Sequence, residues 1–132
     1  MIPVFDISRQ HSQIRQELVN AMEKVLDSGW YILGKEVETF EEEFAEYVGT
    51  SHAVGVASGT DALFISLKAL DIGPGDEVIT VSHTAVATVA AIVQTGATPV
   101  LVDICEESYT MDPSQLPAAL SARTKAIIPV HL

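Results

Sequence analysis

Residues 77–103 read EVITVSHTAVATVAAIVQTGATPVLVD. Two short apolar runs, Glu77–Val81 and Pro99–Asp103, enclose a longer apolar segment, Ala85–Gln94, which Gly96 ends. The short runs have the length and residue types of buried strands, and the longer segment has the length of a helix. Strand, helix and strand in succession predict a βαβ crossover, and therefore a parallel sheet.

The same alternation continues on both sides of this stretch. Before it, Ala53–Ala57 predicts a strand, Thr60–Leu70 a helix and Gly73–Asp76 a turn. After it, Asp112-Pro113 predicts the start of a helix, and Ala126–Val130 predicts another strand. The predicted strands are continuously apolar, as strands covered on both faces must be. The sequence therefore predicts an α/β fold, with a mainly parallel sheet and helices on both faces.

The first third of the chain has a different pattern. Apolar residues recur at helical spacing over Gln10–Asp27 and Glu36–Val48, and the linker between them, Trp30–Gly34, is unusually apolar and aromatic. We expect residues 1–50 to form a helical segment that packs on the α/β domain begun by residues 51–132.

Composition limits the functions that are open to the chain. It has 132 residues, 48% of them hydrophobic, with 7 Lys and Arg against 18 Asp and Glu and a net charge of −11. Such an acidic chain is unsuited to bind nucleic acid or anionic lipid through its overall field. The single Cys105 excludes an internal disulfide framework. With no signal-peptide pattern and no run long enough to span a bilayer, the sequence predicts a cytoplasmic protein.

The end of the sequence is also informative. Residues 127–132 resemble the interior of a buried strand, and domains seldom end on such a strand without a covering helix or tail. We expect the chain to be the front portion of a longer protein, truncated at residue 132. The alternative is that this strand lies at the edge of the sheet.

The sharpest local motif is Ser58-Gly59-Thr60-Asp61, where a predicted strand meets a predicted helix. Free N–H groups at a helix N-terminus suit a phosphate, and Gly59 permits close approach of the backbone. Ser58 and Thr60 offer hydroxyl donors. The alternative is an ordinary helix cap by Thr60, with Asp61 favourably placed in the first turn.

A second motif, Ser82-His83-Thr84, also lies where a strand gives way to a helix. Ligands of open parallel sheets bind beyond the carboxyl ends of the strands, so both motifs could face one crevice. His83 could stack on a flat cofactor or exchange protons, or it could simply cap the helix start or fill the turn. No histidine pair has the spacing of metal ligands, and Cys105 has no basic neighbour that would activate its thiol.

Taken together and in order, seven blocks of the sequence resemble the DegT/DnrJ/EryC1/StrS aminotransferases. The blocks are residues 2–6, 28–34, 36–41, 58–63, 73–80, 83–88 and 124–131. The resemblance implies part of the large domain of a fold-type I, aspartate-aminotransferase-like enzyme that uses pyridoxal 5'-phosphate. It implies a homodimer with its active sites at the subunit interface. It also implies amino transfer from an amino-acid donor, expected to be glutamate, to a nucleotide-linked keto sugar, with a dTDP-linked 3-keto-6-deoxyhexose as the closest match.

The resemblance also assigns residues. Gly59 and Thr60 would hold the cofactor phosphate, with Ser58 close by. His83 would stack on the cofactor ring, with Thr84 beside it, although the aromatic residue of the family more often stands at the position of Ala85. The aromatic linker would border the substrate pocket or the dimer partner through three residues. These are Trp30, Tyr31 and Gly34. Trp30 and Tyr31 could alternatively be simple core anchors.

The family also needs a lysine that binds the cofactor covalently and an aspartate that pairs with its ring nitrogen. Both are expected beyond Leu132, so this chain alone holds no catalytic residue and is expected to be inactive. None of its four lysines has a suitable context: Lys24, Lys35, Lys68 and Lys125. Two alternatives stay open. One is a sugar dehydratase of the same fold, with histidine in place of that lysine, and the other is a non-catalytic binding or sensor module.

Overall fold

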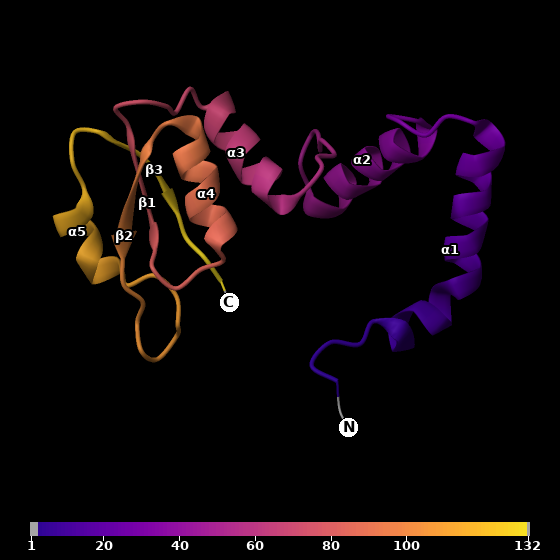
Figure 1. Cartoon of the computed structure of the whole chain (residues 1–132), viewed down its shortest axis with the longest axis horizontal. Helices are drawn as coiled ribbons and strands as arrows, with labels where there is room; N and C mark the ends of the chain where they lie inside the picture. Colours follow the sequence, from indigo (N-terminus) through magenta and orange to yellow (C-terminus); the bar gives the residue numbers. More distant parts are fainter. Residues whose placement is uncertain (1–2, 132) are drawn as a thin grey trace. The chain divides into compact units, whose positions relative to one another are not determined.

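The computed structural model describes residues 3–131. The chain divides into two compact units, Met1–Gly55 and Val56–Leu132. The first unit is helical, and the second contains the sheet and the helices that cover it (Figure 1). This division lies close to the predicted boundary between residues 50 and 51.

A three-stranded parallel sheet forms the centre of the second unit. Strands β1 (Glu77–Val81), β2 (Thr98–Val102) and β3 (Thr124–Ile128) lie in the order β2-β1-β3. In the register, Ile79 of β1 lies opposite Val100 of β2 and Ile127 of β3. The βαβ crossover and the parallel sheet are therefore confirmed, with strand ends within two residues of those predicted.

The side chains of β1 alternate between the two faces of the sheet. Helices cover both faces. On one face, Val78 packs with residues of helices α3 (Gly59–Ala69) and α4 (Val86–Thr95). On the other face, Ile79 and Val81 pack with the short helix α5 (Leu116–Ala119). The first cluster of buried side chains comprises Leu67, Ile72, Val78, Ile92 and Ala97, and the second comprises Ile79, Val81, Val102 and Met111.

All five residues of β1 are buried, which makes it the central element of the core. Its one uncharged polar side chain, Thr80, is fully buried and donates a hydrogen bond of 3.0 Å to the carbonyl oxygen of Ile128. A buried hydroxyl that finds such a partner avoids the cost of an unsatisfied polar group.

The strand predicted at Ala53–Ala57 is wrong. These residues have no regular secondary structure, and Val54 is 78% exposed. No strand lies beside them in the part of the chain that the structure describes, so the backbone groups have no sheet partner. Instead, the N–H of Gly55 donates to Oε1 of Glu41 at 2.6 Å. The prediction rested on apolar composition alone, but a strand forms only where a neighbouring strand accepts its hydrogen bonds.

The helix predicted to begin at Asp112-Pro113 starts as a 3₁₀ turn. Asp112 caps the turn η1 (Pro113–Gln115) by accepting a hydrogen bond of 2.9 Å from the N–H of Ser114, and α5 follows directly. Hydrogen bonding from the Ser114 side chain, and then from this N–H and from Gln115, lowers the pKa of the Asp112 carboxyl group. The predicted cap is correct, and the regular helix is only one turn long.

Two helices make up the first unit: α1 (Ser8–Ser28) and α2 (Lys35–Val48). Gly29 and Gly49 end them in the left-handed conformation, with φ of 64° and 80°, which glycine adopts without strain. The backbone of α1 kinks at Ile14. No residue of α1 is buried, and Ala45 is the only buried residue of α2.

Candidate functional site

The first candidate site is the N-terminus of α3. Ser58, not Thr60, caps this helix: its Oγ accepts a hydrogen bond of 3.1 Å from the N–H of Asp61 and donates one of 2.8 Å to Oδ2 of Asp61. The cap by Thr60 is therefore wrong. Ser58 has the extended backbone of a cap residue, whereas Thr60 is already helical.

Capping by Ser58 leaves two backbone donors available. Within residues 3–131, the N–H groups of Gly59 and Thr60 donate to no acceptor. A Cβ built on Gly59 would meet no atom within 4 Å, so the space in front of this turn is open. Two free N–H groups at the positive end of an eleven-residue helix, reached through open space, fit a phosphate group. The carboxylate of Asp61 lies on the Ser58 hydroxyl.

The second candidate site follows the carboxyl end of β1. The N–H of Ser82 donates to the carbonyl oxygen of Val102 at 2.9 Å, which ties the end of β1 to that of β2. His83 is exposed, and the hydroxyl of Thr84 lies 2.9 Å from that of Thr88. Helix α4 is capped at Ala85 without a side-chain bond, so His83 does not cap it.

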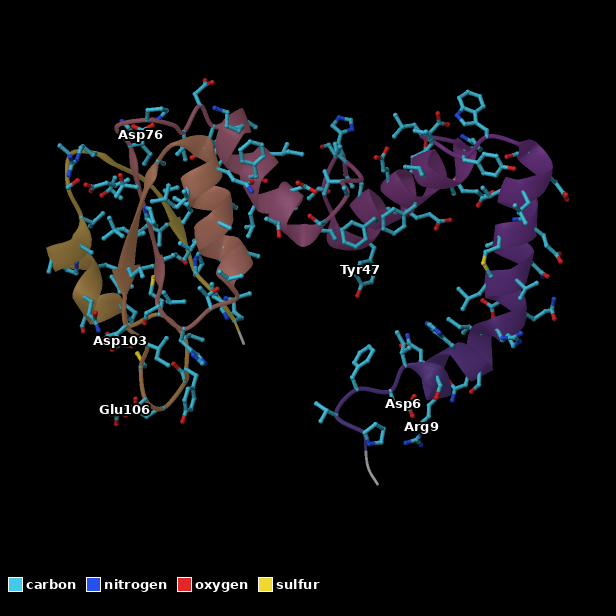
Figure 2. All side chains as sticks on the ribbon, viewed as in Figure 1. Asp6, Arg9, Tyr47, Asp76, Asp103 and Glu106 are labelled. Atoms are coloured by element: carbon cyan, nitrogen blue, oxygen red, sulfur yellow. The ribbon has the colours of Figure 1, made fainter. Side chains whose placement is uncertain are left out.

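The parallel strands give the sheet an amino end and a carboxyl end. Figure 2 shows Asp76 at the amino end of the strands, and Asp103 and Glu106 at the carboxyl end, where β2 stops. Helices α3 and α4 pack together, and both end near the amino edge, because α3 leads into β1 and α4 leads into β2. Their first turns therefore lie toward the carboxyl side. No hydrogen bond joins Ser58, Gly59 or Thr60 to His83 or Thr84 in the described part of the chain.

The aromatic linker of the helical unit encloses a hollow of about 230 Å³. Trp30, Tyr31 and Gly34 all line it, together with residues from the end of α1 and the start of α2. The indole Nε1–H of Trp30 donates to the carbonyl oxygen of Ile32 at 2.6 Å, and Leu33 has a φ of 50°. The three residues that the resemblance assigns to a pocket or interface therefore share one concave surface.

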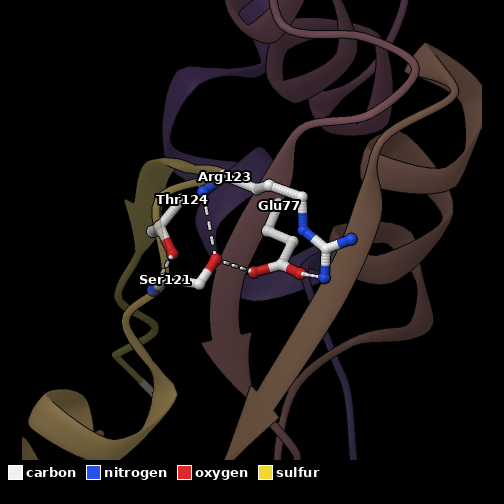
Figure 3. Close-up of polar contacts among 4 residues, drawn as sticks. All are labelled: Glu77, Ser121, Arg123 and Thr124. Atoms are coloured by element: carbon white, nitrogen blue, oxygen red, sulfur yellow. Dashed lines mark hydrogen bonds and ion pairs between the residues drawn. The ribbon is translucent and has the colours of Figure 1, made fainter.

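Two features escaped the sequence prediction. One is Tyr109, whose ring lies 6.4 Å from that of His83, centroid to centroid. The other is a polar cluster at the amino end of the sheet, where Glu77 accepts a hydrogen bond of 2.6 Å from Ser121 and pairs with Arg123 (Figure 3). The positive φ of Tyr109, 55°, is visible only in the structure, and Ser121 and Arg123 lie more than forty residues from Glu77.

The cluster around Glu77 stabilises the sheet. The hydrogen bond from Ser121 and the charge of Arg123 lower the pKa of the Glu77 carboxyl group, and its partial burial opposes them. The N–H of Glu77 also donates to the carbonyl oxygen of Arg123 at 2.8 Å. The cluster joins β1 to the segment before β3 at the end opposite the candidate site.

Two features are absent from residues 3–131. No group of three or more His, Cys, Asp or Glu side chains there could hold a metal ion. Within the same range, no helix has the length and apolar character needed to cross a membrane.

Many α/β domains that bind phosphorylated ligands have a parallel sheet with an open helix N-terminus toward its carboxyl side. Here a turn that contains His83 also lies on that side. The profile of the DegT/DnrJ/EryC1/StrS aminotransferase family matches residues 12–132. The chain belongs to this family.

Individual relatives are close. The chain is 50% identical over 131 residues to a dTDP-3-amino-3,4,6-trideoxy-α-D-glucose transaminase of Streptomyces venezuelae, covering 99% of this chain and 35% of the relative. The crystal structure of S. venezuelae DesV with a ketimine intermediate superposes with a TM-score of 0.95 at 50% identity, covering 99% of this chain and 35% of that one. NtdA of Bacillus subtilis, solved with bound cofactor PMP, gives a TM-score of 0.93 at 33% identity, covering 99% and 30%.

These likenesses confirm the fold class and the family inferred from the sequence. The chain spans about a third of the length of the relatives it matches.

Proposed function

We propose that this chain supplies the cofactor-phosphate site of a pyridoxal-phosphate-dependent aminotransferase that aminates a nucleotide-linked keto sugar. The observation that carries the proposal is the open N-terminus of α3, with unpaired N–H groups at Gly59 and Thr60. It is supported by the transaminase names of the relatives and by the PMP bound in NtdA.

In this proposal each residue has one task. The N–H groups of Gly59 and Thr60 donate to the phosphate, and the Thr60 hydroxyl adds a third donor. Ser58 fixes the turn by capping α3, and His83 lies against the flat ring of the cofactor. When bound, pyridoxal phosphate supplies the electron sink that permits an amino group to be exchanged. The linker at Trp30, Tyr31 and Gly34 forms a wall of the substrate pocket or of the dimer interface.

The substrate and the setting belong to the same proposal. We assign a dTDP-linked 3-keto-6-deoxyhexose as the acceptor, because the relative at 50% identity is named for a dTDP-linked 3-amino sugar. We assign glutamate as the donor, as the family resemblance implies. The active form is a homodimer in the cytoplasm, and the free thiol of Cys105 is compatible with a reducing compartment. In an enzyme that joins this chain to the segment with the cofactor-binding lysine, transfer of ¹⁵N from labelled glutamate to the sugar, followed by mass spectrometry, tests the assignment. A UDP-linked keto sugar is the competing acceptor.

The phosphate site can be tested without turnover. Pyridoxamine 5'-phosphate is the suitable probe, because it has no aldehyde that could react with surface lysines. We expect Thr60→Ala to weaken its binding about tenfold, through the loss of one charge-assisted hydrogen bond, as measured by ³¹P line broadening. Thr50→Ala, at an exposed threonine of the other unit, is the matched control and should bind like the unmodified chain. Equal binding by the Thr60→Ala variant would remove the assignment.

A further inference from the structure

The loop after β2 projects a tyrosine toward the candidate site. Residues Ile104 and Met111 form an antiparallel bridge at the base of this loop, and the N–H of Cys105 donates to the carbonyl oxygen of Thr110 at 2.9 Å. At the tip, the N–H of Tyr109 donates to the carbonyl oxygen of Cys105 at 2.9 Å. The loop is therefore held by its own hydrogen bonds, and Tyr109 is not at a free end.

The backbone of Tyr109 is unusual. Its φ of 55° lies in the left-handed region, which a bulky side chain seldom adopts. Such conformations persist only where the surroundings impose them, and they are concentrated at functional sites. The side chain is nevertheless 60% exposed, so burial of the ring does not account for the conformation.

The conformation places the ring of Tyr109 beside that of His83. The ring centroids are 6.4 Å apart and the ring planes are inclined by 53°, within the range of favourable tilted aromatic pairs. Both residues are anchored in the same core cluster, since His83 lies two residues after Val81 and Tyr109 two residues before Met111. Because β1 and β2 are adjacent and parallel, the segments that follow them meet at one edge of the sheet.

We infer that Tyr109 is a positioning residue, which holds the imidazole of His83 in the orientation needed to contact the cofactor ring. The inference rests on the proposed function for the cofactor, but the pairing of the two rings does not. An exposed histidine without a neighbour would sample several rotamers. The loss of this rotamer entropy on binding would lower the affinity for the cofactor. The tilted contact restricts the imidazole before the cofactor arrives.

The pairing is tested by NMR on the intact chain. We expect nuclear Overhauser contacts between the imidazole protons of His83 and the ring protons of Tyr109, with His83→Gln used for assignment. Tyr109→Phe should retain these contacts and the His83 chemical shifts, because the ring is kept. Tyr109→Gly should move the His83 resonances toward those of the exposed His52, while the loop persists, since glycine tolerates a φ of 55°. Tyr47→Ala, which removes an exposed tyrosine from α2 (labelled in Figure 2), should leave His83 unchanged.

A second measurement separates this inference from the proposed function. On titration with pyridoxamine 5'-phosphate, His83 should respond in the unmodified chain, and Tyr109→Gly should bind several-fold more weakly, with the binding recovered in Tyr109→Phe. If ring contacts are absent and His83 is unaffected by Tyr109→Gly, the positioning role is wrong, whatever the cofactor does. If the ring contacts are present but the probe changes neither the His83 resonances nor the Gly59 amide shift, the proposed function is wrong. The two rings would then pair without a role in cofactor binding.

Discussion

The two units of this chain both form regular structure from clear sequence patterns, but they differ greatly in how many of their residues are buried. Every residue of β1 is buried, whereas no residue of the 21-residue helix α1 is. The apolar stripe of α1 that predicts the helix is therefore largely exposed, with Leu26 at 63%. Periodicity fixes which face of a helix is apolar, but stability comes from what that face packs against.

The largest effect should be seen when one core residue is compared with one residue of the exposed stripe. Ile79→Ala should lower the free energy of unfolding by about 3 kcal/mol, because it leaves a cavity in the core of the sheet. Leu26→Ala should change it by less than about 0.5 kcal/mol, since the side chain already contacts solvent. Urea unfolding followed by circular dichroism measures both. Equal losses of unfolding free energy in the two variants would show that the apolar stripe of α1 is buried in solution. The contrast between the two units would then be wrong.

Hydrogen bonds at the helix starts should show the same contrast on a smaller scale. Ser58→Ala removes the cap of α3, which packs on the core, and should cost about 1 kcal/mol of unfolding free energy. At the start of α1, Asp6 accepts hydrogen bonds from the hydroxyl of Ser8 and, at 2.9 Å, from its N–H. The hydroxyl bond first, and the N–H bond after it, lower the pKa of the Asp6 carboxyl group. Asp6→Ala should nevertheless leave cooperative unfolding unchanged, because no residue of α1 is fully buried. A comparable loss in both variants would contradict the account.

The smallest effect concerns pH. The pKa of Glu77 is held below its ordinary value of 4.5 by Ser121 and Arg123. A lowered pKa means that the stabilisation is present above pH 4.5 and is lost as the pH falls through the folded-state pKa. The urea midpoint of Glu77→Gln should therefore lie below that of the unmodified chain at pH 7, and the gap should close in acid. Glu38→Gln, which breaks the exposed Lys35–Glu38 pair at 3.3 Å, is the control and should show no such dependence.

Much of the fold could be predicted because it rests on local signals. Gly96 and Asp112 mark element ends through backbone conformation and capping, and both were identified from the sequence. The strand at Ala53–Ala57 failed because a strand needs a partner, which apolar composition does not supply. The caps were predicted less well, since Ser58 and Thr60 have similar capping chemistry and only the backbone distinguishes them.

The candidate site divides in the same way. Gly59, Thr60 and His83 were predicted as site residues from their places in the alternation of elements, and the space in front of Gly59 is open. Tyr109 could not have been found, because its role depends on a left-handed φ and on a ring brought near by the fold. Residues whose meaning comes from a neighbour distant in sequence carry no local signal.

The central claim is that the first turn of α3 binds a phosphate through its own backbone. Amide chemical shifts of Gly59 and Thr60, followed during titration with pyridoxamine 5'-phosphate and in parallel with unphosphorylated pyridoxamine, test it most directly. The account predicts that both amides move with the phosphorylated probe and stay in place with the other. If neither amide moves, or if both probes move them equally, the phosphate site is contradicted.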